Sequence, residues 1–182
     1  MKKIFTVIAA ALLIATSASA QHEIGAIVGG LNGASYKYWF NDALALQADL
    51  AVGLTEAYWS QTTNGVTTSR SDGMWDFVLN PNALYHWDLP VSNLKIYAGG
   101  GLSIGLYDML KKPQGESTKV AGKFGINAAA GLAYDFDAVP LVLAFDFRPG
   151  YGLGFGKEQG GNDMFTTHMF DWKIAVALRY KL

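Results

Sequence analysis

Cysteine is absent from the 182 residues of this chain. A disulfide framework and lipid attachment at a cysteine are therefore both excluded. After residue 20 the sequence has no apolar stretch near the roughly 20 residues that a membrane-spanning helix needs, and it shows no hydrophobic pattern of helical period. The formal net charge of −1 is too small to indicate a nucleic-acid partner. These absences leave strands as the main structural elements.

The first 20 residues have the three parts of a secretory signal peptide. Two lysines precede an apolar run of 12 residues, and an Ala-Ser-Ala sequence ends at residue 20. The run is too short for a retained helical anchor. We therefore expect residues 1–20 to be a signal peptide and residues 21–182 to form one domain. Loss of Lys2 and Lys3 lowers the 14 basic residues to 12, against 15 acidic residues, so the mature net charge is −3.

Glycine and aromatic residues are abundant, with 21 Gly, 10 Phe, 9 Tyr and 5 Trp, a composition that suits closely packed strands. Along residues 170–182 every large apolar side chain has an even number and every charged one an odd number. This period of two indicates a strand, and it also holds along residues 141–156. The same test predicts further strands in the regions 44–55, 75–88, 94–107 and 123–136, which makes six long strands.

The region 23–41 admits either one long strand or two short strands hinged at Asn32-Gly33, a dipeptide favoured in type I′ hairpins. Two strands would each be close to the 9 to 11 residues that a tilted strand needs to cross a bilayer. We choose two, because the total is then eight and single-chain bacterial barrels have even strand numbers. The predicted fold class is all-β: a transmembrane antiparallel up-and-down β-barrel of eight strands.

The predicted connections alternate in length. Residues 41–43, 90–93 and 137–140 are short, whereas residues 60–72, 111–121 and 157–165 are long and polar. In outer-membrane barrels the short turns face the periplasm and the long loops face outward. The turn at Asn32-Gly33 would be an unusually short external connection.

A soluble barrel such as a lipocalin also alternates, so the aromatic and glycine residues decide which face meets lipid. The apolar face carries aromatic side chains near both ends of the strands, which matches the two girdles of a membrane barrel. The polar face carries glycines, where a crowded interior gains from the absence of side chains. We therefore place the polar face inside. These glycines are Gly99, Gly101, Gly125, Gly131, Gly150, Gly152 and Gly154.

The polar face contains seven basic and seven acidic residues, so charges buried in the lumen can be paired. With the turn at residues 41–43, Lys37 opposes Gln47 and lies diagonal to Asp49, within reach of a long side chain. Across the next-to-last hairpin, Asp146 opposes Gly131. The predicted polar network of the lumen, a structural rather than a catalytic site, comprises Lys37, Asp49, Asp76, Asp146, Arg148, Lys173 and Arg179.

Three segments carry a family resemblance: residues 30–39, residues 140–149 and the C-terminal residues 177–182. With them the chain resembles the small outer-membrane barrels of the OmpA-transmembrane, OmpX and related porin-like families, over essentially all of residues 21–182. The resemblance implies an outer-membrane location in a Gram-negative bacterium and insertion by the barrel assembly machinery. Such chains usually end in Phe, whereas this one ends in Leu182. Tyr180 keeps the rest of that signal, so we expect assembly to proceed.

Candidate catalytic residues are few. His22, His86 and His168 lie on different strands or ends and show no metal-ligand spacing. The predicted registers place His86 and Ser103 six residues apart, roughly 20 Å, too far for a nucleophile and its base. His168 near Thr166 resembles outer-membrane lipid A deacylases only loosely, because the serine is missing. Glycines at 150, 152, 154 and 156 precede no helix, so they are packing glycines and not a phosphate loop.

These observations lead to an expected function without catalysis. We expect a structural or surface-interaction barrel that contacts membrane lipid and lipopolysaccharide, needs no cofactor or metal, does not bind nucleic acid and is a monomer. An alternative is a transport protein that passes a small solute through the lumen or an apolar ligand sideways through the wall. A lipid-modifying enzyme of the outer membrane is third. The sequence names no extracellular ligand, because loops carry that specificity.

Overall fold

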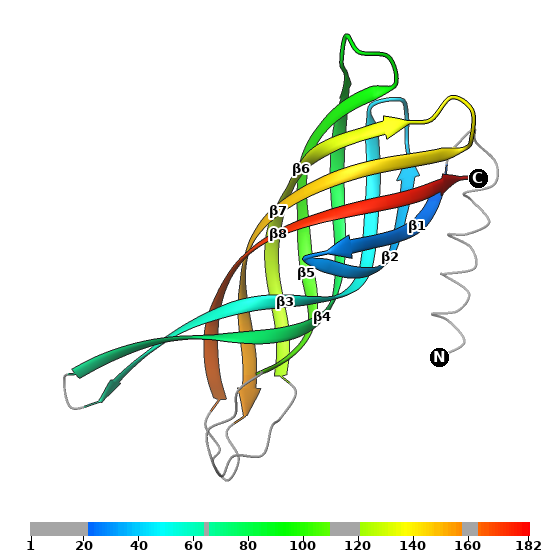
Figure 1. The fold of residues 1–182 in the computed structure, drawn as a ribbon. Helices are drawn as coiled ribbons and strands as arrows, with labels where there is room; N and C mark the ends of the chain where they lie inside the picture. The colour runs from blue at the N-terminus through cyan, green and yellow to red at the C-terminus, as the bar shows by residue number, and fades with distance from the viewer. Residues whose placement is uncertain (1–21, 64–65, 110–120, 158–163) are drawn as a thin grey trace, which may run out of the picture.

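The fold was analysed in a computed structural model, which describes residues 22–63, 66–109, 121–157 and 164–182. Eight antiparallel strands follow one another around a closed barrel in chain order, and the first pairs with the last (Figure 1). Among the described residues, no helix is long and apolar enough to span a membrane. The strands are β1 His22–Gly29, β2 Leu31–Trp39, β3 Leu44–Thr63, β4 Val66–Asp88, β5 Leu94–Met109, β6 Ala121–Asp135, β7 Leu141–Lys157 and β8 Met164–Lys181.

The alternation predicted from the sequence sorts side chains between the two faces of the wall. In β8 the side chain of Val176 is 40% exposed, whereas Ala175 and Ala177 on either side are buried. The charged and glycine face of the strands points into the barrel, and most large apolar residues point outward. A few apolar side chains are buried in the interior, including Ile27, Leu31, Val78, Leu84 and Val142. The predicted short turns at 41–43, 90–93 and 137–140 lie between strands at one end of the barrel, which we call the turn side. The opposite end is the loop side.

The hairpin between β1 and β2 turns at Gly29-Gly30, so the predicted hinge at Asn32-Gly33 is wrong. Ile27 pairs with Gly33, and Gly29 has a φ of 120°, a conformation that only glycine adopts readily. Asn32 lies in β2, where its side chain accepts a hydrogen bond from the Gly29 amide at 3.2 Å and donates one to the Gly29 carbonyl at 2.8 Å. Asn32 therefore stabilises the turn through its side chain without being one of the turn residues.

Beyond this hairpin the wall is closed by β3 and β8 directly. Ala57 pairs with Met169 and Tyr58 with His168, while the Gly30 amide at the hairpin tip donates to the Ile174 carbonyl at 2.7 Å. Figure 1 shows the short blue hairpin ending where β3 crosses toward β8. The loop-side section of the barrel is consequently six strands around, and the turn-side section is eight.

The predicted long loop at 60–72 is instead part of a β-hairpin. β3 and β4 stay paired from Ser60 and Ser69 to Thr63 and Val66. Among the described residues, pairing of β4 with β5 begins only at Met74. Residues 59–63 and 66–70 pair with each other and form a two-stranded ribbon that projects beyond the barrel (Figure 1). Threonine-rich strands favour this extension. Most of the other two predicted loops, 111–121 and 157–165, lies outside the described residues, which omit 110–120 and 158–163.

The polar lumen as candidate functional site

Charged side chains fill the lumen in three groups along its length. The turn-side group contains Glu23, Lys37, Trp39 and His86. The central group contains Asp49, Asp146, Arg148, Arg179 and Tyr97. The loop-side group contains Asp76, Lys123, Asp171 and Lys173. In each group the number of carboxylates equals the number of lysine and arginine side chains. Except for Trp39 and Asp171 all these side chains are buried.

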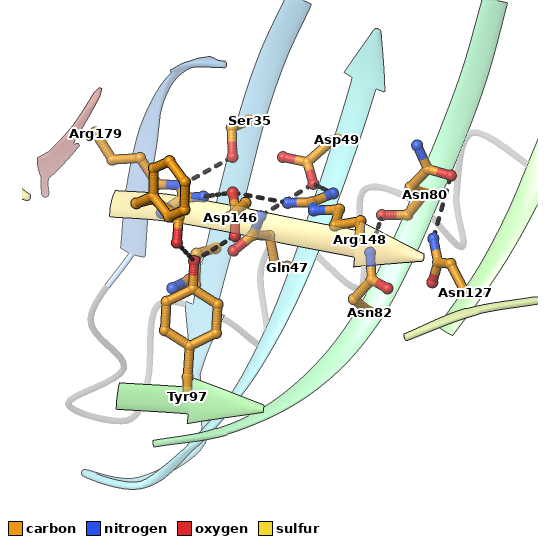
Figure 2. A network of polar contacts seen from close by, with 12 residues as sticks. Ser35, Gln47, Asp49, Asn80, Asn82, Tyr97, Asn127, Asp146, Arg148 and Arg179 are labelled. Atoms are coloured by element: carbon orange, nitrogen blue, oxygen red, sulfur yellow. Dashed lines mark hydrogen bonds and ion pairs between the residues drawn. The ribbon is translucent and has the colours of Figure 1, made fainter. Parts of the chain in front are cut away.

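Arg148 is the hub of the central group (Figure 2). Its Nη1 donates to Asp49 Oδ2 at 2.5 Å, and its Nη2 donates to Asp146 Oδ2 at 3.0 Å. Arg179 Nη2 lies 3.8 Å from the same Asp146 oxygen, and Arg179 Nε donates to the Ser35 hydroxyl at 2.8 Å. The structure thus brings together four of the seven residues of the predicted network, from β3, β7 and β8.

Tyr97 is the fifth member of the central group. The sequence did not predict that this side chain belongs to the polar network. Its hydroxyl donates to Asp146 Oδ1. Tyr97 is the partner of Gly131 across β5 and β6, and Gly131 is the partner of Asp146 across β6 and β7. The glycine between them lets the tyrosine ring lie across β6. The predicted strand registers could have revealed this contact, because they place a tyrosine, a glycine and an aspartate side by side on three neighbouring strands.

The loop-side group joins two lysines to two aspartates. Lys123 Nζ lies 2.6 Å from Asp76 Oδ2 and 3.0 Å from Asp171 Oδ2. Lys173 Nζ lies 3.0 Å from Asp76 Oδ2 and 3.3 Å from Asp171 Oδ2. Asp76 and Lys173, both members of the predicted network, are therefore in contact with each other. They belong to a different group from Asp146. Lys123 and Asp171 complete it.

Lys37 lies in the turn-side group and not beside Asp49. It opposes Gln47 as predicted, but its ammonium lies 3.2 Å from His86 Nε2. His86 Nδ1 faces the Ala43 carbonyl at 3.3 Å, so Nδ1 carries the proton and Nε2 accepts from Lys37. The Lys37 ammonium also lies over the rings of Trp39 and Tyr97, 5.4 and 5.0 Å from their centroids. The faces of these aromatic rings stabilise the positive charge of Lys37, a role that was predicted for the carboxylate of Asp49.

Two glycines of β7 leave a small polar pocket between the central and loop-side groups, as their positions on the lumen face predict. Gly150 and Gly152 line it, and its free volume is about 20 Å³, room for about one or two water molecules. Farther toward the loop side, a Cβ at Gly154 would lie 2.5 Å from both Met169 Cε and Tyr107 Oη, so these side chains fill the lumen there. The pocket is not part of an open channel.

The histidines are distributed as the sequence indicated. His86 lies in the turn-side group, whereas Ser103 lines the pocket. His168 is on the outer face, where its Nδ1 lies 2.5 Å from the hydroxyl of Tyr151. Among the described residues, no group of three or more His, Cys, Asp or Glu side chains is placed to hold a metal ion.

Comparison with known proteins identifies the fold. No protein-family model matches the chain, and no curated protein does. Outer membrane protein OprG from Pseudomonas aeruginosa superposes with a TM-score of 0.58 at 12% identity, covering 91% of this chain and 96% of that one. A major outer membrane protein from Thermus thermophilus gives 0.54 at 11% identity, covering 91% and 100%. Neisserial surface protein A gives 0.50 at 16% identity, covering 90% and 94%.

The chain therefore has the fold of outer-membrane β-barrel proteins, and its surface suits the outer membrane. A wide band of large apolar side chains is exposed around the barrel, including Leu50, Phe77, Ile104, Phe145 and Leu178. Aromatic residues border this band on the turn side at Phe40, Trp87 and Tyr180, and on the loop side at Phe124, Phe155 and Trp172. A soluble protein rarely exposes so continuous an apolar surface.

Proposed function

We propose that this outer-membrane barrel is a structural and surface-interaction protein, whose closed wall anchors the β3–β4 ribbon for contact with host surfaces, lipopolysaccharide or other envelope components. The observation that carries the proposal is the ribbon itself, residues 59–63 paired with 66–70 beyond the last described pairs of β3 with β8 and of β4 with β5. A paired hairpin that projects beyond the barrel extends farther from a membrane than a short turn. It also presents strand edges to an approaching partner.

The filled lumen favours this function over transport. Three groups of charges, balanced in number, occupy the barrel, and in two of the groups the charges form ion pairs. The pocket between these two has room for about one or two water molecules. The pairing also leaves no row of unbalanced charge to guide an ion. The outer face is proposed to contact lipid and lipopolysaccharide, with insertion by the barrel assembly machinery. The proposal includes no catalytic step.

A ribbon deletion that keeps the strand register tests the proposal. Removal of residues 60–63 and 66–69 joins Trp59 to Arg70 through Asn64-Gly65 and deletes four complete cross-strand pairs. Cells with equal surface amounts of the intact and shortened barrels are compared for adhesion to epithelial cells, extracellular-matrix proteins and lipopolysaccharide-coated surfaces. We expect adhesion only with the intact ribbon.

The control is a barrel whose turn at residues 90–93 carries an inserted epitope and whose ribbon is unchanged. It should adhere like the intact protein. Equal adhesion by intact and shortened barrels, or none above cells without the barrel, would show that the ribbon is not a contact element. Steady ion conductance in the same preparation would then favour transport.

A further inference from the structure

An apolar groove crosses the outer face of the barrel near the turn side. Its lining comes from four neighbouring strands, β5 to β8, and includes Leu94, Leu132, Tyr134, Leu143, Phe145 and Val176. Two rows of side chains form it: Tyr134 pairs with Leu94 and with Leu143, and Phe145 pairs with Leu132 and with Val176. Except for the Tyr134 hydroxyl, the lining side chains are apolar. The free volume of the groove is about 250 Å³.

The groove lies within the turn-side half of the wall. At one end the Tyr134 ring packs edge-on against Phe136, with 5.1 Å between the centroids, just before the short turn at 137–140. At the other end Val176 lies five residues before Lys181, where β8 ends. Five residues of a strand span roughly 17 Å, and strand tilt makes the depth smaller. The groove therefore fits within one leaflet of a bilayer whose apolar core is about 30 Å thick.

The size of the groove matches one stretch of hydrocarbon chain. Its free volume of about 250 Å³ corresponds to about eight groups of the size of water, each about 30 Å³, and a methylene group is of similar size. Lipid tails are as apolar as leucine, so the fit of shapes decides which chain stays in contact with the wall. An empty groove would leave its lining without van der Waals partners. A single acyl chain supplies them.

Opposite charges lie at the rim beside the groove. Asp135 follows Tyr134 in β6, and its Oδ2 atom lies 3.1 Å from Lys181 Nζ. The side chains of Asp135 and Lys181 are 30% and 29% exposed, so a lipid headgroup can reach both. A headgroup with a phosphate and an ammonium complements this pair, whereas a headgroup with only a phosphate would face the Asp135 carboxylate without compensation. The Tyr134 hydroxyl is a donor for an ester carbonyl between headgroup and chain.

We propose that this groove binds one phospholipid of the periplasmic leaflet, whose acyl chain fills the groove and whose zwitterionic headgroup contacts Asp135 and Lys181. The inference rests on the lipid contact included in the proposed function and on an outward ribbon, which places the turn side in the periplasm. It does not depend on what the ribbon binds. Failure of the adhesion test would leave the lipid site standing, and failure of the lipid test would leave adhesion unchanged.

Native mass spectrometry of barrels purified in a mild detergent tests the proposal. The intact protein should retain one phospholipid with an amine headgroup. Added phosphatidylethanolamine should bind about fivefold more tightly than phosphatidylglycerol with the same acyl chains. Phosphatidylethanolamine with a dibrominated stearoyl chain locates the site, because crystals grown with it should show an anomalous difference peak in the groove.

Val176→Phe fills one end of the groove and should lower the apparent affinity for phosphatidylethanolamine about tenfold. Val52→Phe is the matched control, because Val52 on β3 is also exposed on the outer face and lies outside the lining. It should retain lipid like the intact protein. If Val176→Phe does not fold, Leu132→Phe takes its place, with Leu79→Phe as the control at a similarly exposed position outside the lining.

Asp135→Asn tests the headgroup contact separately from the chain. It removes the carboxylate with little change of shape and leaves Lys181 for the phosphate. The preference for phosphatidylethanolamine over phosphatidylglycerol should disappear, while the brominated chain should still give its peak in the groove. Equal affinity of the intact protein for the two phospholipids would overturn the headgroup assignment.

Several results would overturn the site itself. One is the absence of retained phospholipid from the intact barrel, and another is equal retention by Val176→Phe and Val52→Phe. A bromine peak outside the groove would place the lipid elsewhere. Lipopolysaccharide bound in place of phospholipid, or a second barrel seated against this face, would show that the groove has a different occupant.

Discussion

At the scale of single residues, the lumen network depends as much on missing side chains as on charged ones. Tyr97, Gly131 and Asp146 occupy one row across β5, β6 and β7. A Cβ at Gly131 would collide with the hydroxyl and ring of Tyr97 and with the Phe145 carbonyl. The hydrogen bond from Tyr97 to Asp146 is possible only because nothing stands between them.

Gly131→Ala is therefore expected to destabilise the barrel by about 1 to 3 kcal/mol, the usual cost of overpacking. The free energy of unfolding, from urea titration in lipid vesicles, measures this. Gly122→Ala on the same strand is the control, because a Cβ there meets nothing within 4 Å. Equal stability of the two variants would mean that the Tyr97 ring has room to move and that the row is not tightly packed.

Sequence periodicity predicts which charged residues point inward, but it does not predict their partners. The seven residues of the predicted network all face the lumen and are buried. Lys37 contacts His86 and lies over two aromatic rings instead of pairing with Asp49, because long side chains choose among several neighbours around a narrow barrel. Partners such as Asp49 and Arg148 are 99 positions apart, a distance that only barrel closure spans.

At the scale of elements, the β1–β2 hairpin is short for a membrane strand pair. Its strands have 8 and 9 residues, at or below the 9 to 11 that a tilted strand needs to cross the bilayer. The tip therefore ends close to the apolar layer, where every backbone polar group needs a protein partner. Asn32 supplies partners for the amide and the carbonyl of Gly29.

Asn32→Ala should destabilise the barrel by about 1 to 3 kcal/mol, because both Gly29 groups lose their partner near lipid. Asn41→Ala is the control. Asn41 accepts hydrogen bonds from the amides of Ala43 and Leu44 in the first short turn, where water replaces the lost acceptor. Unfolding in vesicles should show the larger loss for Asn32→Ala; the reverse order would place the hairpin tip in water.

The outer face of β8 gives a second prediction at this scale. Val176 is exposed among Phe145 on β7 and Val28 on β1. Val176→Arg should cost about 2 to 4 kcal/mol if the position is near the bilayer midplane, and Val176→Ser should cost less. Val176→Leu keeps the apolar surface and serves as the control. A more stable Arg variant than Leu variant would indicate that this face meets water.

The strands and the three short turns were predictable, because the alternation of apolar and polar residues stops at each of these turns. Two hairpins at the other end of the barrel were not. Asn32-Gly33 and Asn64-Gly65 are both favoured hairpin dipeptides. The first lies in β2, since Gly29 and Gly30 nearby form the turn instead. The second follows Thr63 and precedes Val66, which pair with each other, but the polar threonines around it have no apolar face to reveal a strand.

At the scale of the whole molecule, the barrel has one end with short turns and one end with long connections. We expect the turn side to face the periplasm, as in other outer-membrane barrels. An epitope inserted between Asn64 and Gly65 should be stained on intact cells, and the same epitope within residues 90–93 should be stained only after permeabilisation. Staining of the second tag alone on intact cells would mean that the barrel is inserted in the opposite direction.

Closure of the lumen follows from the number of strands and from the charges they carry. Eight strands enclose an interior just wide enough for side chains to fill, and the loop-side section, bounded by β3 to β8, is narrower. Charges in each of the three groups are matched, so the obstruction is both steric and electrostatic. We therefore expect no steady conductance from the intact protein in planar bilayers.

Arg148→Ala tests how far closure of the lumen depends on Arg148, which contacts both aspartates of the central group. The variant leaves Asp49 without the guanidinium, and Asp146 keeps only Arg179 as an ion-pair partner among the described residues. Loss of one partner of a buried ion pair costs about 3 to 5 kcal/mol, so the barrel should lose stability and show brief cation-selective openings. Lys181→Ala, at the half-exposed rim pair with Asp135, should cost at most about 1 kcal/mol and leave the bilayer current unchanged. Steady current from the intact protein, persisting on dilution and absent from detergent alone, would contradict the closed lumen, because paired charges that block the path cannot also conduct.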